Sequence, residues 1–316
     1  MKEQVNRVCE LLDHHVTRRF AGPTPLNEDE GEVLPFLFHR LFTDEELNED
    51  IYLHERVTVP LFDRFVGHCR ALGYGFITPS EVLRGQHVGK RSVMITFDDG
   101  YADNLRALPI LERHDAKATF FLSPAHISEH RRFWWDALHA QGIRSFSEYQ
   151  EMAFGEARSR IEGRWPGGFQ PAGELDRAMS LDEFETLAAS DRVEIGHHSF
   201  NHTVLAGRDR EYVEAEIEQT NAFFQRHLGF KPEAIAYPNG VYTDALVDLC
   251  VEQGLRVGLT CDFRSERLSR NPGAERLMRL GRVMVSGTRP LLPQISAATL
   301  QPSLKRGVYG LKRALR

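Results

Sequence analysis

Two adjacent carboxylates, Asp98 and Asp99, follow an apolar stretch at residues 92–97 and precede Gly100. Active sites of α/β enzymes form at the carboxyl ends of parallel strands. Successive strand side chains point to opposite faces, but a turn containing glycine can bring both acids to one site. One acid can then bind a metal while the other accepts a proton. Taken alone, these three residues are more typical of a solvated turn.

Two histidines four residues apart, His198 and His202, follow a second short apolar stretch at residues 193–196. Imidazoles at this spacing can converge on one cation. The chain has 14 histidines, so one such pair can also arise by chance. Alone, this motif is weak evidence for a metal site.

The two motifs carry more weight together, because each ends a predicted strand and both should lie on one rim of the same sheet. Asp99, His198 and His202 would then form a two-histidine, one-carboxylate site with open coordination positions. This donor set suits a hydrolytic Zn²⁺, and Co²⁺, Mn²⁺ or Fe²⁺ can also occupy it. We therefore expect a divalent metal cofactor, with zinc as the first choice.

Alternating strand and helix patterns surround these motifs. Strands are predicted at residues 33–38, 92–97, 118–122, 193–196, 234–237, 256–259 and 282–285, and helices at 60–72, 104–114, 133–140, 181–189, 211–228 and 243–253. This alternation predicts a parallel sheet, either doubly wound or closed into a barrel. A segment near residues 141–180, with several glycines and prolines, is predicted to be an irregular insertion that shapes a cleft.

Residues 96–100, Thr-Phe-Asp-Asp-Gly, resemble the first motif of the polysaccharide deacetylases, the NodB-homology family related to carbohydrate esterase family 4. Residues 198–202, His-Ser-Phe-Asn-His, resemble the second motif, in the family's order and spacing. The similarity extends over about residues 33–286. It implies a distorted (β/α) barrel of about seven strands. It also implies that Asp98 is the general base and that Asp99, His198 and His202 bind the metal.

The implied activity is metal-dependent removal of N-acetyl groups from a sugar or glycan, so the expected partner is an N-acetylated carbohydrate. The metal would polarise the amide carbonyl and activate water, and Asp98 would accept the water's proton. In the family a backbone N–H of the third motif stabilises the oxyanion. The matching position here is near Asn239, with Tyr237 beside it, although this segment also fits an ordinary turn.

The chain departs from the family pattern at two points. Ala236 replaces the arginine that opens the third motif, and the late Leu-x-x-His motif that supplies the catalytic acid is missing. His39 and His197 are the candidates for the acid, and either could equally be structural. Arg282 corresponds in place to a late arginine of divergent members, where it would orient Asp98 or bind substrate. A surface arginine is the equal alternative.

Trp135, next to Trp134, has two interpretations. It could stack on a sugar ring as a subsite, although paired tryptophans at a helix start more often pack in a core or at its rim.

Composition excludes several classes of protein. The formal net charge of −6, without a long basic block in the body of the chain, gives no reason to expect nucleic acid as a partner. The four cysteines are scattered and form no metal or disulfide motif. The first residues do not resemble a signal peptide, and no apolar run suits a bilayer, so we expect a cytoplasmic location.

Three regions are expected: an N-terminal arm at residues 1–32, the deacetylase domain at 33–286, and a basic C-terminal tail at 287–316. Residues 305–316 hold five basic residues and no acid, with apolar residues at helical spacing. Such a helix can pack on the barrel or contact an anionic membrane surface, which would make the protein membrane-associated.

Three alternative functions stay open. A non-sugar amidase or deformylase could use the same metal and water chemistry. A catalytically impaired glycan-binding homologue would explain the missing acid, although it would not need Asp98. An iron oxygenase with two histidines and one carboxylate is disfavoured, because such sites normally sit on an all-β framework.

Overall fold

The computed structural model describes residues 26–150 and 152–299. These residues form one sheet of nine strands in the order β7-β6-β5-β4-β3-β1-β8, with β2 beside β3 and β9 beside β1. The strands are β1 (Glu30–Phe38), β2 (Gly75–Phe76), β3 (Arg91–Phe97), β4 (Ala118–Leu122), β5 (Val193–His197), β6 (Ala234–Ala236), β7 (Val257–Leu259), β8 (Glu266–Ser269) and β9 (Val283–Met284). The seven strands of the main path curl into a half-barrel, which confirms the predicted α/β fold.

The sheet is mixed, because β8 runs antiparallel to β1 while the other paired strands are parallel. The predicted parallel strands are present, and the antiparallel edge strand β8 is an addition that the sequence pattern did not predict. An antiparallel edge strand on a parallel sheet is common. The strand went unrecognised because its sequence, Glu-Arg-Leu-Ser, lacks the continuous apolar run of a buried parallel strand.

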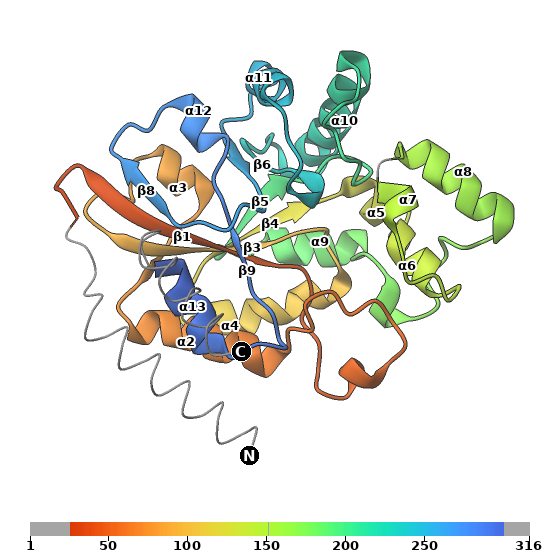
Figure 1. Cartoon of the computed structure of the whole chain (residues 1–316), viewed down its shortest axis with the longest axis horizontal. Coiled ribbons are helices and arrows are strands. Elements are labelled where there is room, and N and C mark those ends of the chain that lie inside the picture. Colours follow the sequence, from red (N-terminus) through yellow and green to blue (C-terminus); the bar gives the residue numbers. More distant parts are fainter. Residues whose placement is uncertain (1–25, 151, 300–316) are drawn as a thin grey trace, which may run out of the picture.

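Helices cover the sheet on both sides: Figure 1 shows α2 and α4 below the strands and α10 and α11 above them. The helices of the described residues are α2 (Val59–Ala71), α3 (Pro79–Leu83), α4 (Leu108–Arg113), α5 (Pro124–Ser128), α6 (Trp134–His139), α7 (Ser147–Gln150), α8 (Phe154–Arg164), α9 (Leu181–Ala188), α10 (Arg210–Leu228), α11 (Asp244–Glu252), α12 (Ala274–Leu277) and α13 (Leu291–Thr299). None of them is long and apolar enough to cross a membrane.

Local sequence signals explain where several helices begin and end. Thr58, Asp209 and Thr243 each accept a hydrogen bond from a backbone N–H in the first turn of α2, α10 and α11. Gly229 ends α10 in the left-handed conformation that glycine adopts without steric cost.

Three expectations need correction. The segment near 141–180 is not irregular, because α7, α8 and a 3₁₀ turn lie within it. Phe154, Ala157 and Ile161 of α8 pack with Trp134 and Trp135 in a small separate hydrophobic core. The expected helix at 104–114 begins as a 3₁₀ turn and becomes α4. Strand β1 starts three residues earlier than predicted. The expected amphipathic helix at 305–316 lies outside the described residues.

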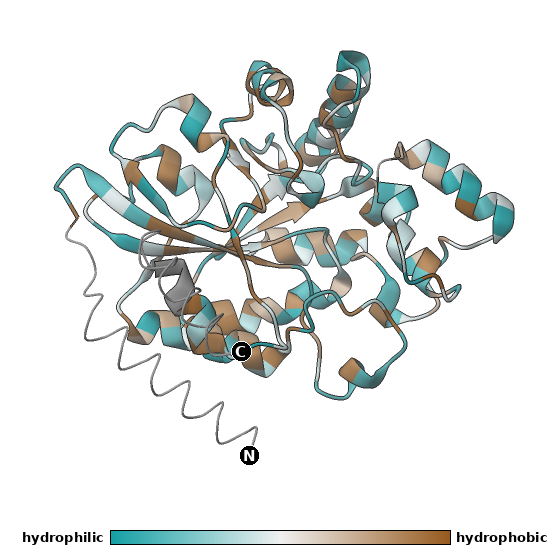
Figure 2. Cartoon of the chain, in the orientation of Figure 1, coloured by the Kyte–Doolittle hydropathy of each residue, from teal (hydrophilic) through white to brown (hydrophobic). Residues whose placement is uncertain are grey.

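The central strands are strongly apolar, as their brown colour in Figure 2 shows. Phe36 and Phe38 of β1 pack edge-on against Phe65 of α2, and Phe97 of β3 stacks on Phe120 of β4. This buried core fixes β3, β4 and β5 side by side and parallel. Their carboxyl ends therefore meet at one edge, where the two predicted motifs begin.

Candidate metal centre and active-site pocket

A strained turn at the end of β3 carries both carboxylates to the same pocket. The Asp98 N–H donates to the Phe38 carbonyl, and the Gly100 N–H donates back to the Asp98 carbonyl. Asp99 has a φ of 76°, which non-glycine residues rarely adopt, and such strain is often found at functional sites. Gly100 has a φ of 101°, and an added Cβ would meet Leu122 at 3.0 Å. The turn thus requires glycine at position 100.

The loop after β5 is held by a buried glutamate of α10. Glu216 accepts hydrogen bonds from the backbone N–H and the side-chain amide of Asn201, at 3.0 and 2.8 Å. Ser199 accepts from the Thr203 N–H at 2.9 Å, and both Ser199 and His202 have positive φ angles. These contacts fold residues 198–202 so tightly that both histidine rings face Asp99.

Asp99, His198 and His202 form a buried cluster whose donor atoms lie within 4.8 Å of one another. Asp99 Oδ1 lies 3.1 Å from His202 Nε2 and 3.5 Å from His198 Nε2, close to the ~3.4 Å between neighbouring ligands of a tetrahedral zinc ion with ~2.1 Å bonds. His198 Nδ1–H donates to the Ala236 carbonyl at 2.7 Å, which leaves the Nε2 lone pair directed at the cluster.

The chemistry of this cluster fits a divalent cation. Asp99 Oδ1 is buried and has no hydrogen-bond partner in the structure, a costly state for a carboxylate oxygen. Burial alone would raise the pKa of Asp99, but His202 outweighs it and holds the pKa well below its usual value. The carboxylate is therefore ionised, as a metal ligand must be.

Asp98 is paired with Arg282. The guanidinium donates to both carboxylate oxygens, at 2.7 and 2.8 Å, and also to the Thr96 hydroxyl and the Thr260 carbonyl. Burial would raise the pKa of Asp98, but Arg282 holds it below its usual value. Arg282 is itself only 1% exposed, so the alternative of a surface arginine is wrong. Asp98 remains an ionised carboxylate that lies 3.9 Å from His198.

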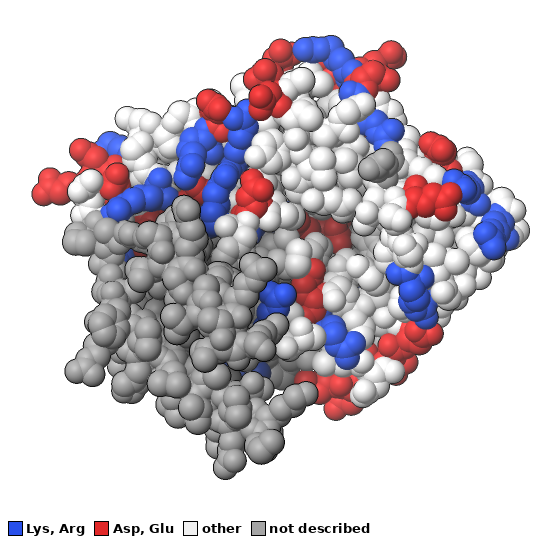
Figure 3. Space-filling view, viewed as in Figure 1, with Lys and Arg blue, Asp and Glu red and all other residues white. Residues whose placement is uncertain are grey.

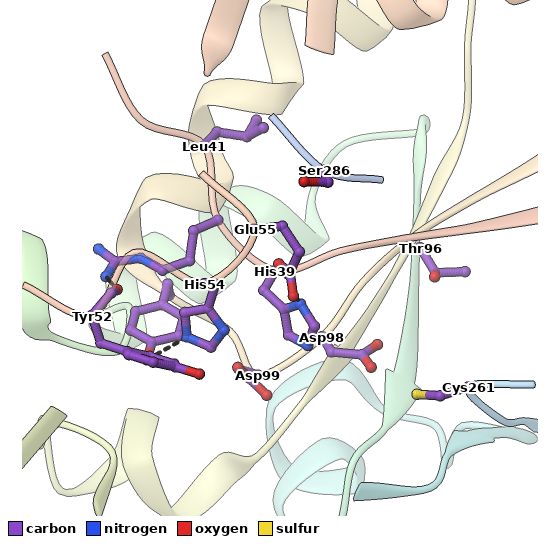
Figure 4. A network of polar contacts seen from close by, with 12 residues as sticks. His39, Leu41, Tyr52, His54, Glu55, Thr96, Asp98, Asp99, Cys261 and Ser286 are labelled. Atoms are coloured by element: carbon purple, nitrogen blue, oxygen red, sulfur yellow. Dashed lines mark hydrogen bonds and ion pairs between the residues drawn. The ribbon is translucent and has the colours of Figure 1, made fainter. Parts of the chain in front are cut away.

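His39 directly follows β1, and its ring lies close to Asp98 and Asp99 (Figure 4). Its Nδ1 pairs with Glu55 at 2.9 Å. Burial would lower the pKa of His39, but Glu55 raises it to about 10. The neighbouring His54, whose ring lies 4.9 Å from that of His39, has its pKa lowered to about 3, chiefly by burial.

A pocket of about 690 Å³ opens above these groups. Its floor contains the Asp98 and Asp99 carboxylates, and its walls include four aromatic side chains: Tyr52, Trp134, Trp135 and Phe146. Figure 3 shows acidic atoms set into a hollow near the centre of the visible face. Segments from β1, β3, β5 and the 141–180 region therefore contribute to one cleft.

Some of the other residues predicted to belong to the site line the pocket, and others are buried away from it. His39 and Asn239 line the pocket. His197 is fully buried and outside the lining, where its Nδ1 accepts from the Ser199 N–H, so it is not positioned to act as the acid. Tyr237 is also wrong as a substrate contact, because its side chain is fully buried and its hydroxyl donates to the Met278 carbonyl. Tyr237 instead packs in a core cluster with Leu246 and Cys250 of α11.

Trp135 lines the pocket but is only 5% exposed. Its indole N–H donates to the Tyr101 hydroxyl at 2.6 Å, and its ring packs edge-on against His202 at 4.6 Å. Its main contacts therefore support the ring of His202, while one edge borders the cleft.

Sequence reasoning missed Tyr52, His54 and Glu55, which come from the loop after β1. No periodic pattern marks that loop. The only available signal was its cluster of charged and aromatic residues so soon after a strand end.

Residues 85–258 match the polysaccharide deacetylase family, and the chain therefore belongs to it. Two Bacillus subtilis proteins are similar: YlxY is 24% identical over 148 residues and YxkH is 22% identical over 195 residues, covering 47% and 60% of this chain. The aligned regions span only 30% and 53% of those relatives. The Streptococcus pyogenes deacetylase PplD, solved with acetate, superposes with a TM-score of 0.60 at 19% identity, covering 84% of this chain and 98% of PplD.

We predict that Glu216→Gln weakens metal binding by about 10- to 100-fold. Residues that orient metal ligands through hydrogen bonds, without binding the metal themselves, typically contribute this much to metal affinity. An amide cannot accept both hydrogen bonds from Asn201, so the loop that carries His202 would relax. Competition of Zn²⁺ between the protein and a chromophoric chelator measures the affinity. Glu214→Gln, on the same helix but outside this contact, is the matched control. Equal affinities for the two variants would contradict the role assigned to Glu216.

Proposed function

We propose that this protein is a metal-dependent hydrolase that removes N-acetyl groups from a sugar or glycan. The observation that carries the proposal is the unpartnered, buried Asp99 Oδ1 between two histidine Nε2 atoms, with the ionised Asp98 beside it. This combination provides a metal site and a separate base in one pocket. A binding protein would have no need for the second carboxylate.

Asp99, His198 and His202 would hold the cation, most simply Zn²⁺. A divalent cation there supplies Lewis acidity for the amide carbonyl and lowers the pKa of water. Asp98 accepts the proton of the attacking water, while Arg282 fixes the direction of its two oxygens. Asn239, on the pocket wall, is the proposed donor of a backbone N–H to the developing oxyanion.

His39 is the proposed acid that protonates the leaving amine. It lines the same pocket as Asp98, and Figure 4 shows its ring beside that carboxylate. Glu55 favours the protonated imidazolium, which is the form that can donate a proton. This assignment would replace the histidine that the family's missing late motif normally supplies.

An N-acetylated carbohydrate is the proposed substrate class, because aromatic side chains suit the apolar faces of sugar rings and line the cleft over its acidic floor. Nothing in the described residues favours nucleic acid. The cytoplasmic location and the membrane contact of the tail stay predictions.

Acetate release from a panel of N-acetylated oligosaccharides and lipid-linked sugars tests the proposal. The metal-loaded protein is expected to release acetate, and Asp98→Asn is expected to lower the rate by about 10²- to 10⁴-fold, the usual contribution of a general base. Asp191→Asn, a change to an exposed carboxylate, is the control. If this panel yields no acetate but N-formylated or other non-sugar amides assayed beside it are hydrolysed, the result would favour an amidase or deformylase. Metal binding without hydrolysis of any amide would favour a binding role.

A further inference from the structure

A second group of possible metal ligands lies against the first. The donor atoms of His39, His54 and Asp99 lie within 4.8 Å of one another. The two histidine rings are nearly parallel, at 22°, and lie side by side above Asp99 (Figure 4). This cluster uses residues from the loop after β1, which the family motifs do not include.

The hydrogen-bond network around Tyr101 sets the tautomer of His54. The Tyr101 hydroxyl donates to Asp136 at 2.6 Å and accepts from the Trp135 indole N–H. Since its one proton is given to Asp136, Tyr101 can only accept from His54 Nε2, which lies 3.2 Å away. His54 Nε2 therefore carries the hydrogen, and the Nδ1 lone pair is free on the other side of the ring.

His39 shows the second pattern typical of a metal ligand. Its Nδ1 pairs with the Glu55 carboxylate, which leaves Nε2 as the nitrogen available to a cation. Ligand histidines usually give their other ring N–H to a carboxylate or another oxygen acceptor. His39 with Glu55, His54 with Tyr101 and His198 with the Ala236 carbonyl all follow this rule.

Asp99 has two oxygens, so it can serve both clusters. Oδ1 lies between His198 and His202 and has no hydrogen-bond partner. Carboxylates that bridge two cations about 3.5–4 Å apart are common in hydrolases. We propose that a second divalent cation binds between His39, His54 and Asp99, adjacent to the first metal centre and bridged to it by Asp99.

A cation bound there would use the Nε2 lone pair of His39, so that nitrogen could not also carry a proton. If His39 is the acid, which rests on the proposed function, occupation of this site removes the acid from catalysis. Excess metal would then inhibit the enzyme, so this would be an inhibitory metal site.

Titration of the untagged, metal-free full chain with Mn²⁺, followed by electron paramagnetic resonance, tests the site without reference to activity. The work is done at pH 8, where Asp136, whose pKa burial raises to about 7, is ionised. The first equivalent is expected to give the spectrum of an isolated bound ion, and the second the exchange-coupled spectrum of two neighbouring ions. A coupled spectrum cannot come from ions bound singly elsewhere on the surface.

His54→Phe keeps a ring in the same space but removes both nitrogens, so it should retain the isolated signal and lose the coupled one. His114→Asn, at a histidine paired with Asp63 away from the pocket, should behave like the wild type. A wild type without a coupled spectrum, or a coupled spectrum that persists in His54→Phe, would overturn the second site. Absence of any bound ion at the first equivalent would instead overturn the metal centre itself, and the shared site with it.

Discussion

Replacement of Arg282 with methionine is expected to lower the free energy of unfolding by about 3–5 kcal/mol and to abolish measurable hydrolysis. Loss of one partner from a buried ion pair leaves the other charge without compensation, and this is the typical cost. Asp98 would lose both charge-assisted hydrogen bonds, and its pKa would rise because burial would then dominate. The carboxylate would no longer be a correctly oriented, ionised base.

Urea unfolding followed by tryptophan fluorescence measures the stability change. Arg256→Met provides the matched control, because Arg256 pairs with Glu233 at 3.1 Å on the exposed surface, where such pairs contribute about 0–1 kcal/mol. The double variant Arg282→Met with Asp98→Leu should recover much of the lost stability, since no buried charge remains. Similar stabilities for Arg282→Met and the control would show that the buried pair does not have the proposed energetic role.

His202→Ala is expected to weaken binding of the first metal ion by more than about 100-fold, beyond the range typical of changes in outer contacts. Only His198 and Asp99 would remain in the first cluster, and two protein ligands are fewer than catalytic zinc sites use. Isothermal titration calorimetry with Zn²⁺ on the metal-free protein measures the affinity, and activity should fall in parallel.

The matched control for this measurement is His114→Ala, which removes a histidine that pairs with Asp63 outside the pocket. Its Zn²⁺ affinity should equal that of the wild type. Unchanged affinity in His202→Ala would mean that the ion binds elsewhere, and the assignment of the cluster would then be wrong.

The family, the α/β fold and the composition of the metal cluster were predictable from the sequence. The reason is that each depends on short-range signals: apolar strands that end in polar residues, and a motif whose spacing is set by one turn. Because parallel strands end at a common edge, Asp99 could be grouped with His198 and His202 although 99 positions separate Asp99 from His198. The places of the main parallel strands and most helix limits followed from the same local patterns, whereas β2 and the antiparallel β8 were not predicted.

Only the tertiary structure decided which of the remaining candidates face the pocket. The family resemblance allowed Arg282 either to orient Asp98 or to lie on the surface, and only the structure shows the contact, across 184 positions. The loop after β1 brings His54 and Glu55 to the carboxylates, and no sequence pattern predicts this. His197 and Tyr237 were sequence neighbours of functional residues, yet both are buried away from the cleft. The sequence determines which side chains are available at a strand end, but the direction each one takes depends on turn conformation and on which face the core fills.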